Sequence, residues 1–256
     1  MIKAITARLQ QGYKTTAYPD GPAPELPGKY RGMPIVERSN CPSDCRLCAD
    51  ACATKAIEID KTVRFDLGRC LFCTDCADAC PSTNIRYAND YRLSCQTRED
   101  LVVESGGEIA LFQSLDTKLR RLLGRSLKLR QVSAGGCNAC EADVNVLTTI
   151  GWDLSRFGIQ FVASPRHADG LLITGCVTEN MRGALEKTYA AVASPKIVIA
   201  VGACAISGGP FAENPQQHKG IPLSIPVDIY IPGCPPHPLT ILDGLLRVIG
   251  RLSEST

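Results

Sequence analysis

The sequence lacks the features that mark a secreted or membrane-spanning chain. Its N-terminus (MIKAITARLQQGYKTTAYPDG) has no apolar segment followed by a small-residue cleavage site, so we expect no secretory signal. No run of about eighteen apolar residues occurs, and we therefore expect no transmembrane helix. Neither sign of charge dominates, because 28 Lys and Arg residues stand against 26 Asp and Glu residues. This balance argues against a nucleic-acid-binding protein.

What the sequence does contain is cysteine, at 14 of its 256 positions. The length suggests one or two domains, and a hydrophobic share of 45% is enough for a packed core. A chain of this size needs no disulfide framework. Intracellular thiols stay reduced unless they bind metal or take part in redox chemistry. The cysteines therefore predict metal binding.

Composition divides the chain into four segments. Residues 1–40 are rich in Pro and Gly and predict an extended arm without a core of its own. Residues 41–105 hold nine of the cysteines, and residues 106–130 have leucines at helical spacing, which predicts a basic linking helix. Residues 131–256 form the last segment. From Leu129 onward, short apolar runs alternate with helix-like stretches and predict an α/β domain of the flavodoxin-like kind with a mostly parallel sheet. The expected strands are 129–132, 159–163, 170–174, 196–201 and 227–231, and the expected helices are 140–150, 178–193 and 238–251.

The cysteine-rich segment contains an internal repeat. The string CRLCADAC (45–52), followed by Ile57, matches CTDCADAC (73–80), followed by Ile85, with each matched pair 28 residues apart. Cys70 precedes the second string by three positions, and Pro81 follows it. The second copy is thus the C-x2-C-x2-C-x3-C-P run of bacterial ferredoxins, which predicts a ferredoxin-like α+β domain with two 4Fe-4S clusters.

The spacing also predicts how the thiols are shared. Three thiolates in one tight loop can surround a corner of a cluster, whereas the fourth cysteine of such a run ligates the other cluster. The crossed sets are Cys41, Cys45, Cys48 and Cys80 for cluster 1, and Cys70, Cys73, Cys76 and Cys52 for cluster 2. Zinc bound by C-x2-C pairs is the alternative, but the duplicated run is more specific to iron–sulfur. The first copy departs from the pattern by an x3 loop after Cys41 and by Ala53 in place of proline. Cys95 has no partner nearby and is interpreted as a buried thiol.

Five further cysteines follow predicted strands of the α/β segment. Ligands of open α/β sheets bind outside the carboxyl ends of the strands, and glycines beside these cysteines permit a close backbone approach. Four thiolates from separate loops meeting at that edge would hold a third cluster. The five are Cys137, Cys140, Cys176, Cys204 and Cys234.

Four strings carry a resemblance to a known family: CNACE (137–141), SPRHADGLLITG (164–175), VGACAISGG (201–209) and VDIYIPGCPPHP (227–238). Together they resemble the small subunit of energy-converting nickel–iron hydrogenases of the group 4, formate hydrogenlyase-like kind, which is homologous to the 20 kDa, terminal-cluster subunit of complex I. Residues 1–105, with GRCLFC (68–73), resemble the two-cluster ferredoxin subunit of the same complexes. The chain thus looks like a fusion of the two.

The resemblance implies the ligands of the third cluster. It assigns them to Cys137, Cys140, Cys204 and Cys234, and Cys176 falls where relatives commonly have Ala or Pro, so we expect it not to bind iron. Hydrogenase small subunits have C-x2-C followed by Glu, as in CNACE, whereas complex I relatives have adjacent cysteines. The spacing favours the hydrogenase branch.

The function that the resemblance implies is an electron relay. Three 4Fe-4S clusters would carry electrons to or from the nickel–iron site of a partner large subunit, where hydrogen is formed or oxidised, so this oxidoreductase chain holds no catalytic centre itself. The expected partners are that large subunit, membrane-arm subunits and a ferredoxin or formate dehydrogenase as electron donor. The expected location is the cytoplasm, at the cytoplasmic face of the inner membrane through the partners; no twin-arginine signal is present.

Two other functions stay open at this point. One is the equivalent relay subunit of a complex I-like quinone or ferredoxin oxidoreductase without nickel. The other is a free-standing ferredoxin-like carrier, which the α/β half weakens because a terminal cluster needs a partner face. The sequence of the neighbouring large subunit would separate the first two, since a nickel–iron site needs two C-x2-C pairs.

Three further residues are candidates for tuning the third cluster or its protons: Glu141, Arg166 and His167. The alternatives are a surface carboxylate that caps the helix for Glu141 and a structural pair that holds its loop for Arg166 and His167. The segment 118–130 carries six basic residues and no acid, and we expect it to dock on the large or membrane subunit.

Overall fold

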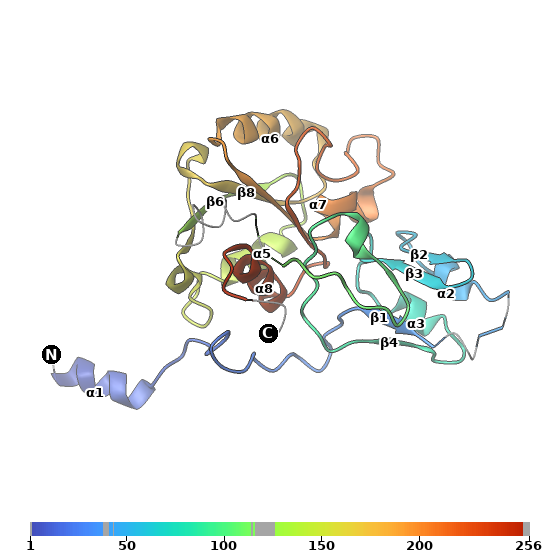
Figure 1. The fold of residues 1–256 in the computed structure, drawn as a ribbon, viewed down its shortest axis with the longest axis horizontal. Coiled ribbons are helices and arrows are strands. Elements are labelled where there is room, and N and C mark those ends of the chain that lie inside the picture. Colours follow the sequence, from blue (N-terminus) through green and yellow to red (C-terminus); the bar gives the residue numbers. More distant parts are fainter. Residues whose placement is uncertain (1, 38–40, 43, 114, 116–125, 253–256) are drawn as a thin grey trace.

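The computed structural model describes residues 2–37, 41–42, 44–113, 115 and 126–252. Figure 1 shows two regions side by side, an α/β domain and a smaller cysteine-rich region, with an N-terminal arm that runs beneath both. The arm is not extended throughout, because it begins with helix α1 (Ile2–Gln11). Its middle part packs onto the α/β domain, where Tyr18 is buried in the core. The arm has no core of its own, but its middle part therefore contributes to the core of the α/β domain.

The α/β domain is built on five parallel strands. In spatial order they are β10 (Ile229–Ile231), β9 (Ile197–Val201), β8 (Gly170–Thr174), β6 (Leu127–Ser133) and β7 (Ile159–Phe161). Every neighbouring pair is parallel. If the five strands are renumbered along the chain and read from β7 to β10, this order is 2-1-3-4-5, which is that of flavodoxin-type sheets. The alternation of strands and helices expected from the sequence is confirmed.

Helices cover both faces of this sheet, as Figure 1 shows. α6 (Glu179–Ala191) lies on one face, and α5 (Ala139–Val146) and α8 (Pro238–Val248) lie on the other. Strand β8 is fully buried, and its side chains alternate between the two faces of the sheet. Leu171 and Ile173 pack toward α6, and Leu172 packs toward α8. This burial explains why the strand is a continuous apolar run.

The cysteine-rich region repeats one structural unit. Helices α2 (Leu47–Asp50) and α3 (Asp75–Asp78) are one turn each and follow the two cysteine loops. β1 (Pro34–Val36) pairs with β4 (Ile85–Tyr87) in an antiparallel ribbon. A second antiparallel sheet has the order β2 (Ile57–Ile59), β3 (Val63–Asp66) and β5 (Val102–Glu104). The region is thus α+β, with two small sheets around the cysteine loops.

The linking helix expected over 106–130 is absent from the described part of that range. Residues 126–130 lead into and form strand β6, and residues 106–113 are non-helical. Within residues 106–113, Leu111 forms an isolated β-bridge with Cys95. Tertiary pairing thus overrides the helical leucine spacing at both ends. Of the basic segment 118–130, residues 118–125 lie outside the described residues.

The two regions share a continuous core. Ala200 of β9 and Ala205 and Ile206 of α7 (Ala203–Ser207) pack with apolar side chains of the cysteine-rich region. The segment around Cys95 adds to the free edge of β10, since the backbone N–H groups of Cys95 and Tyr230 donate to each other's carbonyl oxygens at 3.0 and 2.9 Å. Ser207 Oγ also donates to the Gly68 carbonyl at 2.9 Å. These contacts fix the cysteine loops relative to the sheet.

Candidate iron–sulfur centres

Two cavities of the cysteine-rich region are each bordered by four thiols. Cys41, Cys45, Cys48 and Cys80 line one of them, together with Val36, Leu47, Ile59, Val63 and Ile85. Cys52, Cys70, Cys73 and Cys76 line the other, with Phe65 and Tyr87 among their neighbours. The fold thus brings together the two crossed sets of the sequence analysis.

Hydrogen-bond donors point at several of these sulfurs. The backbone N–H of Ala56 donates to Cys52 Sγ at 3.2 Å, and that of Phe72 donates to Cys70 Sγ at 3.3 Å. Asn84 Nδ2 donates to Cys41 Sγ at 3.4 Å from a side chain that is itself buried. Such donors favour thiolate over thiol, and they are one of the means by which a protein sets the potential of a bound cluster.

Burial opposes the same ionisation. Desolvation raises the pKa of Cys70 to about 12, and it also raises the pKa values of Cys48, Cys73 and Cys76. A buried thiolate therefore needs positive charge beside it, which iron would supply. Among the described residues, no three His, Cys, Asp or Glu side chains could share a single metal ion. Apolar cavities edged by four thiols fit the charge and donor set of a cluster.

A third set of thiols meets at the carboxyl ends of the parallel strands. Cys137 and Cys140 lie where the chain leaves β6 and enters α5, Cys204 lies in α7 after β9, and Cys234 follows β10. Glycines allow the sulfurs to approach the backbone. A Cβ at Gly202 would lie 2.6 Å from Cys140 Sγ, and one at Gly209 would lie 2.9 Å from Cys204 Sγ. Gly202 also has a φ of 89°, which favours glycine.

Electrostatic coupling shows that these thiols are close to one another. Burial raises the pKa of Cys204 to about 12, and the neighbouring Cys234, Cys176 and Cys137 contribute in the same direction. The pKa of Cys140 is also raised, first by burial and then by Cys204, Glu141, Cys234 and Cys137. Ionised sulfurs gathered in this way require a cation between them. The donor set fits a third cluster.

Cys176 lies near this set but its thiol has another partner. The side chain is fully buried, and its Sγ donates to the Gly135 carbonyl at 3.3 Å. Cys95 is likewise fully buried, and its Sγ lies 3.6 Å from the Leu93 carbonyl oxygen. Both thiols are therefore engaged with the backbone.

Glu141 is not the surface carboxylate that was one interpretation of the sequence. Its side chain is 5% exposed, and Oε1 accepts hydrogen bonds from Ser133 Oγ and Thr174 Oγ1, both at 2.6 Å. It does not cap α5, because the N-cap position is Asn138. The two hydroxyls come from β6 and β8, so the carboxylate joins the start of α5 to the sheet beside Cys140.

Arg166 and His167 lie at the wrong edge of the sheet for a role beside the third set. They form a short 3-10 turn (Pro165–His167) that precedes β8, so they lie at the amino ends of the strands, and both are exposed. The five residues of β8 separate that edge from Cys176, a span of about 16 Å. Their position before the predicted strand 170–174 already indicated the amino end, but the resemblance alone suggested a role beside the cluster.

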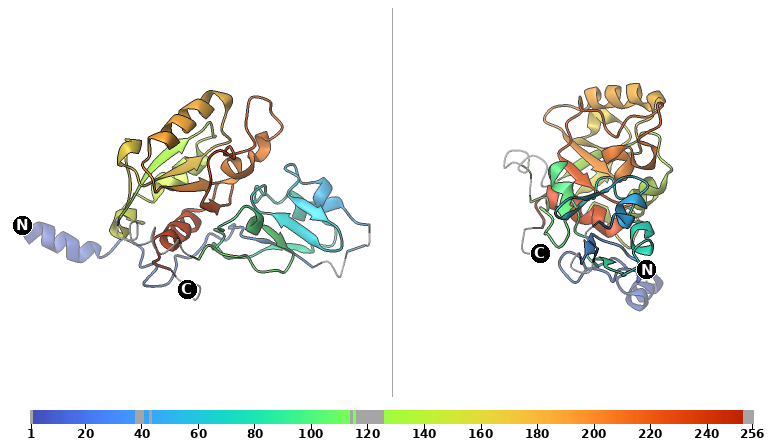
Figure 2. Two further views of the ribbon diagram at one scale, coloured as in Figure 1. Left: turned by 45° about the horizontal axis from the view of Figure 1, so that its top comes forward. Right: turned by 90° about the vertical axis from the view of Figure 1, so that its right-hand side faces the viewer.

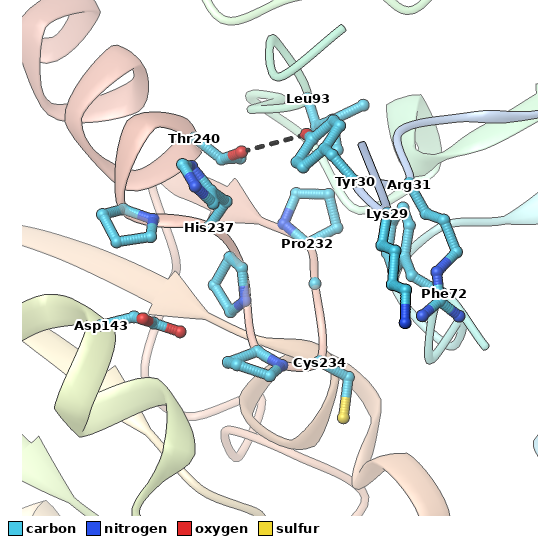
Figure 3. A pocket seen from close by; sticks show the side chains of 14 residues that line it. Lys29, Tyr30, Arg31, Phe72, Leu93, Asp143, Pro232, Cys234, His237 and Thr240 are labelled. Atoms are coloured by element: carbon cyan, nitrogen blue, oxygen red, sulfur yellow. Dashed lines mark hydrogen bonds between the residues drawn. The ribbon is translucent and has the colours of Figure 1, made fainter. Parts of the chain in front are cut away.

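A cavity beside Cys234 was not expected from the sequence. Figure 3 shows Asp143, His237 and Thr240 on one side of it and Lys29 and Arg31 of the arm on the other. His237 Nδ1 accepts the Leu239 N–H at 3.1 Å and so caps α8, and burial lowers the pKa of His237. Burial also raises the pKa of Asp143. No local pattern links the arm to the loop after β10, so only the tertiary structure reveals this cavity.

The fold and the gathered thiols define an iron–sulfur electron-transfer subunit. Residues 137–248 match the family described as "NADH ubiquinone oxidoreductase, 20 Kd subunit", and residues 40–84 match the "4Fe-4S dicluster domain". The chain belongs to the 20 kDa subunit family, with a dicluster ferredoxin region joined to it.

Three relatives illustrate the range of this family. The "Probable membrane-bound hydrogenase subunit mbhJ" of Pyrococcus furiosus is 40% identical over 137 residues, which are 54% of this chain and 82% of the relative. "Formate hydrogenlyase subunit 7" of Escherichia coli is 41% identical over 141 residues, 55% of each chain. A subunit of the NADH-quinone oxidoreductase of Phocaeicola vulgatus is 38% identical over 148 residues, 57% of this chain and 73% of the relative. The chain thus resembles both hydrogenase and complex I subunits.

No helix in the described residues is both long enough and apolar enough to span a bilayer.

Proposed function

We propose that this chain is the electron-relay subunit of a nickel–iron hydrogenase-type complex, in which three 4Fe-4S clusters carry electrons to or from a partner large subunit. Bound clusters would supply one-electron transfer. The observation that supports the proposal most strongly is that twelve of the 14 cysteines gather in three groups of four, two of them in the crossed arrangement of a two-cluster ferredoxin.

The ligands in this proposal are the three sets described above. Cys41, Cys45, Cys48 and Cys80 would hold cluster 1; Cys70, Cys73, Cys76 and Cys52 cluster 2; and Cys137, Cys140, Cys204 and Cys234 cluster 3. Residues 41–105 would then be the two-cluster domain and residues 131–256 the one-cluster domain. Cys95 and Cys176 would bind no iron, since their thiols already contact carbonyl oxygens.

Contacts between the regions support an order for the relay. The pKa of Cys234 is raised by burial and then by Cys137 and Cys73, so a cluster 2 thiol lies within electrostatic reach of the third set. Phe72, next to Cys73, lines the same cavity as Cys234. Among the described residues, no thiol of the first set shifts the pKa of Cys234. Electrons would therefore pass from cluster 1 through cluster 2 to cluster 3, or in reverse.

The third set is open on one side. Cys137 and Cys234 are exposed, whereas Cys204 is buried. The cavity in Figure 3 borders Cys234 on this open face. A terminal cluster with two exposed ligands would be covered by the subunit that receives its electrons, so this face would dock the large subunit. The large subunit would hold the catalytic nickel–iron centre.

Two observations favour a hydrogenase as the complex to which this chain would belong. The relatives include proteins named as subunits of a membrane-bound hydrogenase and of formate hydrogenlyase. The CNACE string also has the C-x2-C-Glu spacing of hydrogenase small subunits. Membrane-arm subunits would then hold the complex at the cytoplasmic face of the membrane, and a ferredoxin or a formate dehydrogenase would exchange electrons with cluster 1.

The test uses the complex purified anaerobically through a tag on this chain. We expect nickel in the preparation and hydrogen evolution from a reduced viologen. Cys204→Ser should abolish hydrogen evolution, whereas Cys176→Ser, a change of a buried thiol at the same edge, should retain it. A purified complex without nickel would contradict the hydrogenase assignment.

The second candidate is a complex I-like oxidoreductase without nickel, which the similarity to an NADH-quinone oxidoreductase component supports. The same preparation separates the two, since this candidate predicts no nickel and reduction of a quinone or ferredoxin that depends on Cys204.

A further inference from the structure

Helix α1 has no partner within the described chain. None of its residues from Ile2 to Gln11 is buried, and Figures 1 and 2 show it projecting away from the two regions. Most helical stability in proteins comes from packing of an apolar face, and a ten-residue helix is marginal without it. None of the described residues therefore covers its apolar face, and a surface that did so would stabilise the helix.

The apolar side chains of α1 lie on one face. Ile2, Ile5 and Leu9 follow the helical repeat, and they are 82%, 57% and 79% exposed. Beyond Gly12, which ends the helix, Tyr13 is 88% exposed and its ring stacks under the Arg8 guanidinium at 4.6 Å. The opposite face carries Gln11 and the small side chains of Ala4 and Ala7. The large apolar side chains of the helix are thus confined to one face, and that face is open.

The charge of this segment is of one sign. The first 19 residues carry Lys3, Arg8 and Lys14 and no acid, whereas the rest of the chain holds 25 basic and 26 acidic residues. Since successive residues of a helix are rotated by about 100°, Lys3 and Arg8 lie on either side of the apolar face. Long basic side chains at such positions can reach a charged surface while the apolar face is buried.

The base of the arm is fixed to the α/β domain. The Thr16 N–H donates to the Gly151 carbonyl at 2.9 Å, and Arg156 donates to the carbonyls of Thr16 and Tyr18, both at 2.7 Å. Ile150, beside this anchor, is 76% exposed. Five of the nine large exposed apolar side chains among the described residues thus lie at this end of the molecule. The helix leaves the body from an anchored point next to a further apolar residue.

We propose that α1 lies flat on an anionic lipid bilayer, with Ile2, Ile5 and Leu9 below the headgroups and Lys3, Arg8 and Lys14 among the lipid phosphates. Basic amphipathic helices bind membranes in this way, through buried apolar area and attraction to anionic lipid. Tyr13 has the amphipathic ring that is enriched at this level of a bilayer. A groove on a protein would need acidic residues placed opposite Lys3, Arg8 and Lys14. An anionic bilayer carries negative charge over its whole surface and needs no such placement. This contact is direct and does not rest on the proposed electron relay.

The test is flotation of the full chain, purified with its clusters, with vesicles of phosphatidylcholine alone or mixed with phosphatidylglycerol. We expect binding to the anionic vesicles, a reduction of at least fivefold on phosphatidylcholine, and loss in 0.5 M salt, since screening weakens the attraction. Ile5→Gln with Leu9→Gln should reduce binding at least tenfold. Ala4→Gln with Ala7→Gln makes the matching change on the opposite face, keeps the charge and should leave binding within twofold.

Three results would overturn the proposal: absence of binding to anionic vesicles, equal binding to both vesicle types, or equal loss in the two pairs of variants. If α1 instead docks on a partner protein, the wild-type chain will not bind vesicles, and the variant with Ile5→Gln and Leu9→Gln will dissociate from its complex. Iron content should be unchanged in both double variants, so a failure here is distinct from a failure of the relay.

Discussion

At the scale of single residues, the hydrogen-bond donors to the sulfurs include backbone groups and a side chain. The N–H groups of Ala56 and Phe72 donate to Cys52 and Cys70, and no substitution other than proline removes them. The donor to Cys41 is the side chain of Asn84, held in a buried position next to β4. The potential of cluster 1 is therefore open to a direct test by mutation.

Asn84→Leu should lower the reduction potential of cluster 1 by an amount on the order of tens of millivolts, since one hydrogen bond is lost that stabilises the more negative, reduced state. An EPR-monitored redox titration measures the shift. Asn89→Leu, the same change at an exposed position nearby, should leave the potential unchanged. An equal shift in both variants would contradict the assignment of Asn84 as the donor.

The raised thiol pKa values predict two opposite responses to pH. In the folded apo chain, Cys70 and Cys204 have pKa values of about 12, against about 8.5 for an unfolded cysteine. Above pH 8.5 the unfolded chain loses these protons first, so the stability of the apo chain should fall as pH rises toward 12, measured by urea unfolding. Iron binding displaces the same protons, so iron retention against a chelator should keep rising above pH 8.5. A plateau at pH 8.5 in both measurements would contradict the raised values.

The sequence predicted the groups of thiols but not the orientation of the other candidates. Spacing predicted the eight cysteines of the two ferredoxin sets, because those ligands recur at fixed intervals along the chain, whereas the resemblance implied the four of the third set. Whether Glu141 faces the sheet or solvent depends on Ser133 and Thr174, which come from other elements. Arg166 and His167 precede the strand 170–174 and so lie at its amino end, away from the thiols. The cavity beside Cys234 likewise requires the arm and the loop after β10 to meet.

At the scale of elements, the two regions are joined by a tight contact between the cluster 2 loop and α7. A Cβ at Gly68 would lie 2.7 Å from Ile206 Cγ2 and 2.9 Å from Arg98 Cζ. Arg98 Nη2 donates to Asp66 Oδ2 at 2.6 Å, and Ser207 Oγ donates to the Gly68 carbonyl. This contact sets the separation between the second and third thiol sets.

Gly68→Ala should destabilise the chain by about 1–3 kcal/mol, because the methyl group forces Ile206 and Arg98 to move. It should also weaken the magnetic coupling between clusters 2 and 3, measured by EPR of the reduced protein. Gly28→Ala is the control, since a Cβ at Gly28 meets no atom within 4 Å. Unchanged stability and coupling in Gly68→Ala would show that the contact does not position the clusters.

Some helices and strands were predicted correctly from the sequence and others were not. The five strands and three long helices of the α/β domain were expected, because fully buried strands and amphipathic helices leave strong periodic patterns. The helix expected over 106–130 was wrong at its described ends, where pairing of Leu111 with Cys95 and of β6 with β7 and β8 overrides leucine spacing. Helix α1 was missed because prolines and glycines further along the arm masked its short amphipathic pattern.

At the scale of the whole molecule, the chain would join a two-cluster carrier to a one-cluster terminal subunit on a shared core. Two separate subunits would have to associate to bring the second and third thiol sets together, whereas here Ala200, Ala205 and Ile206 pack with the cysteine-rich region inside one chain. The order of the three sets is then a property of the fold. Among the described residues, none buries Cys137 or Cys234, so a partner could contact both.

The number of clusters that the chain holds is given by the iron and acid-labile sulfide content of the full chain, purified anaerobically and compared with that of two variants. Three four-iron clusters predict about twelve irons per chain. Cys204→Ser should lower the content to about eight, and Cys176→Ser should leave it at about twelve. A wild-type content of about eight irons or fewer, or an equal loss in both variants, would contradict a third cluster held by Cys137, Cys140, Cys204 and Cys234.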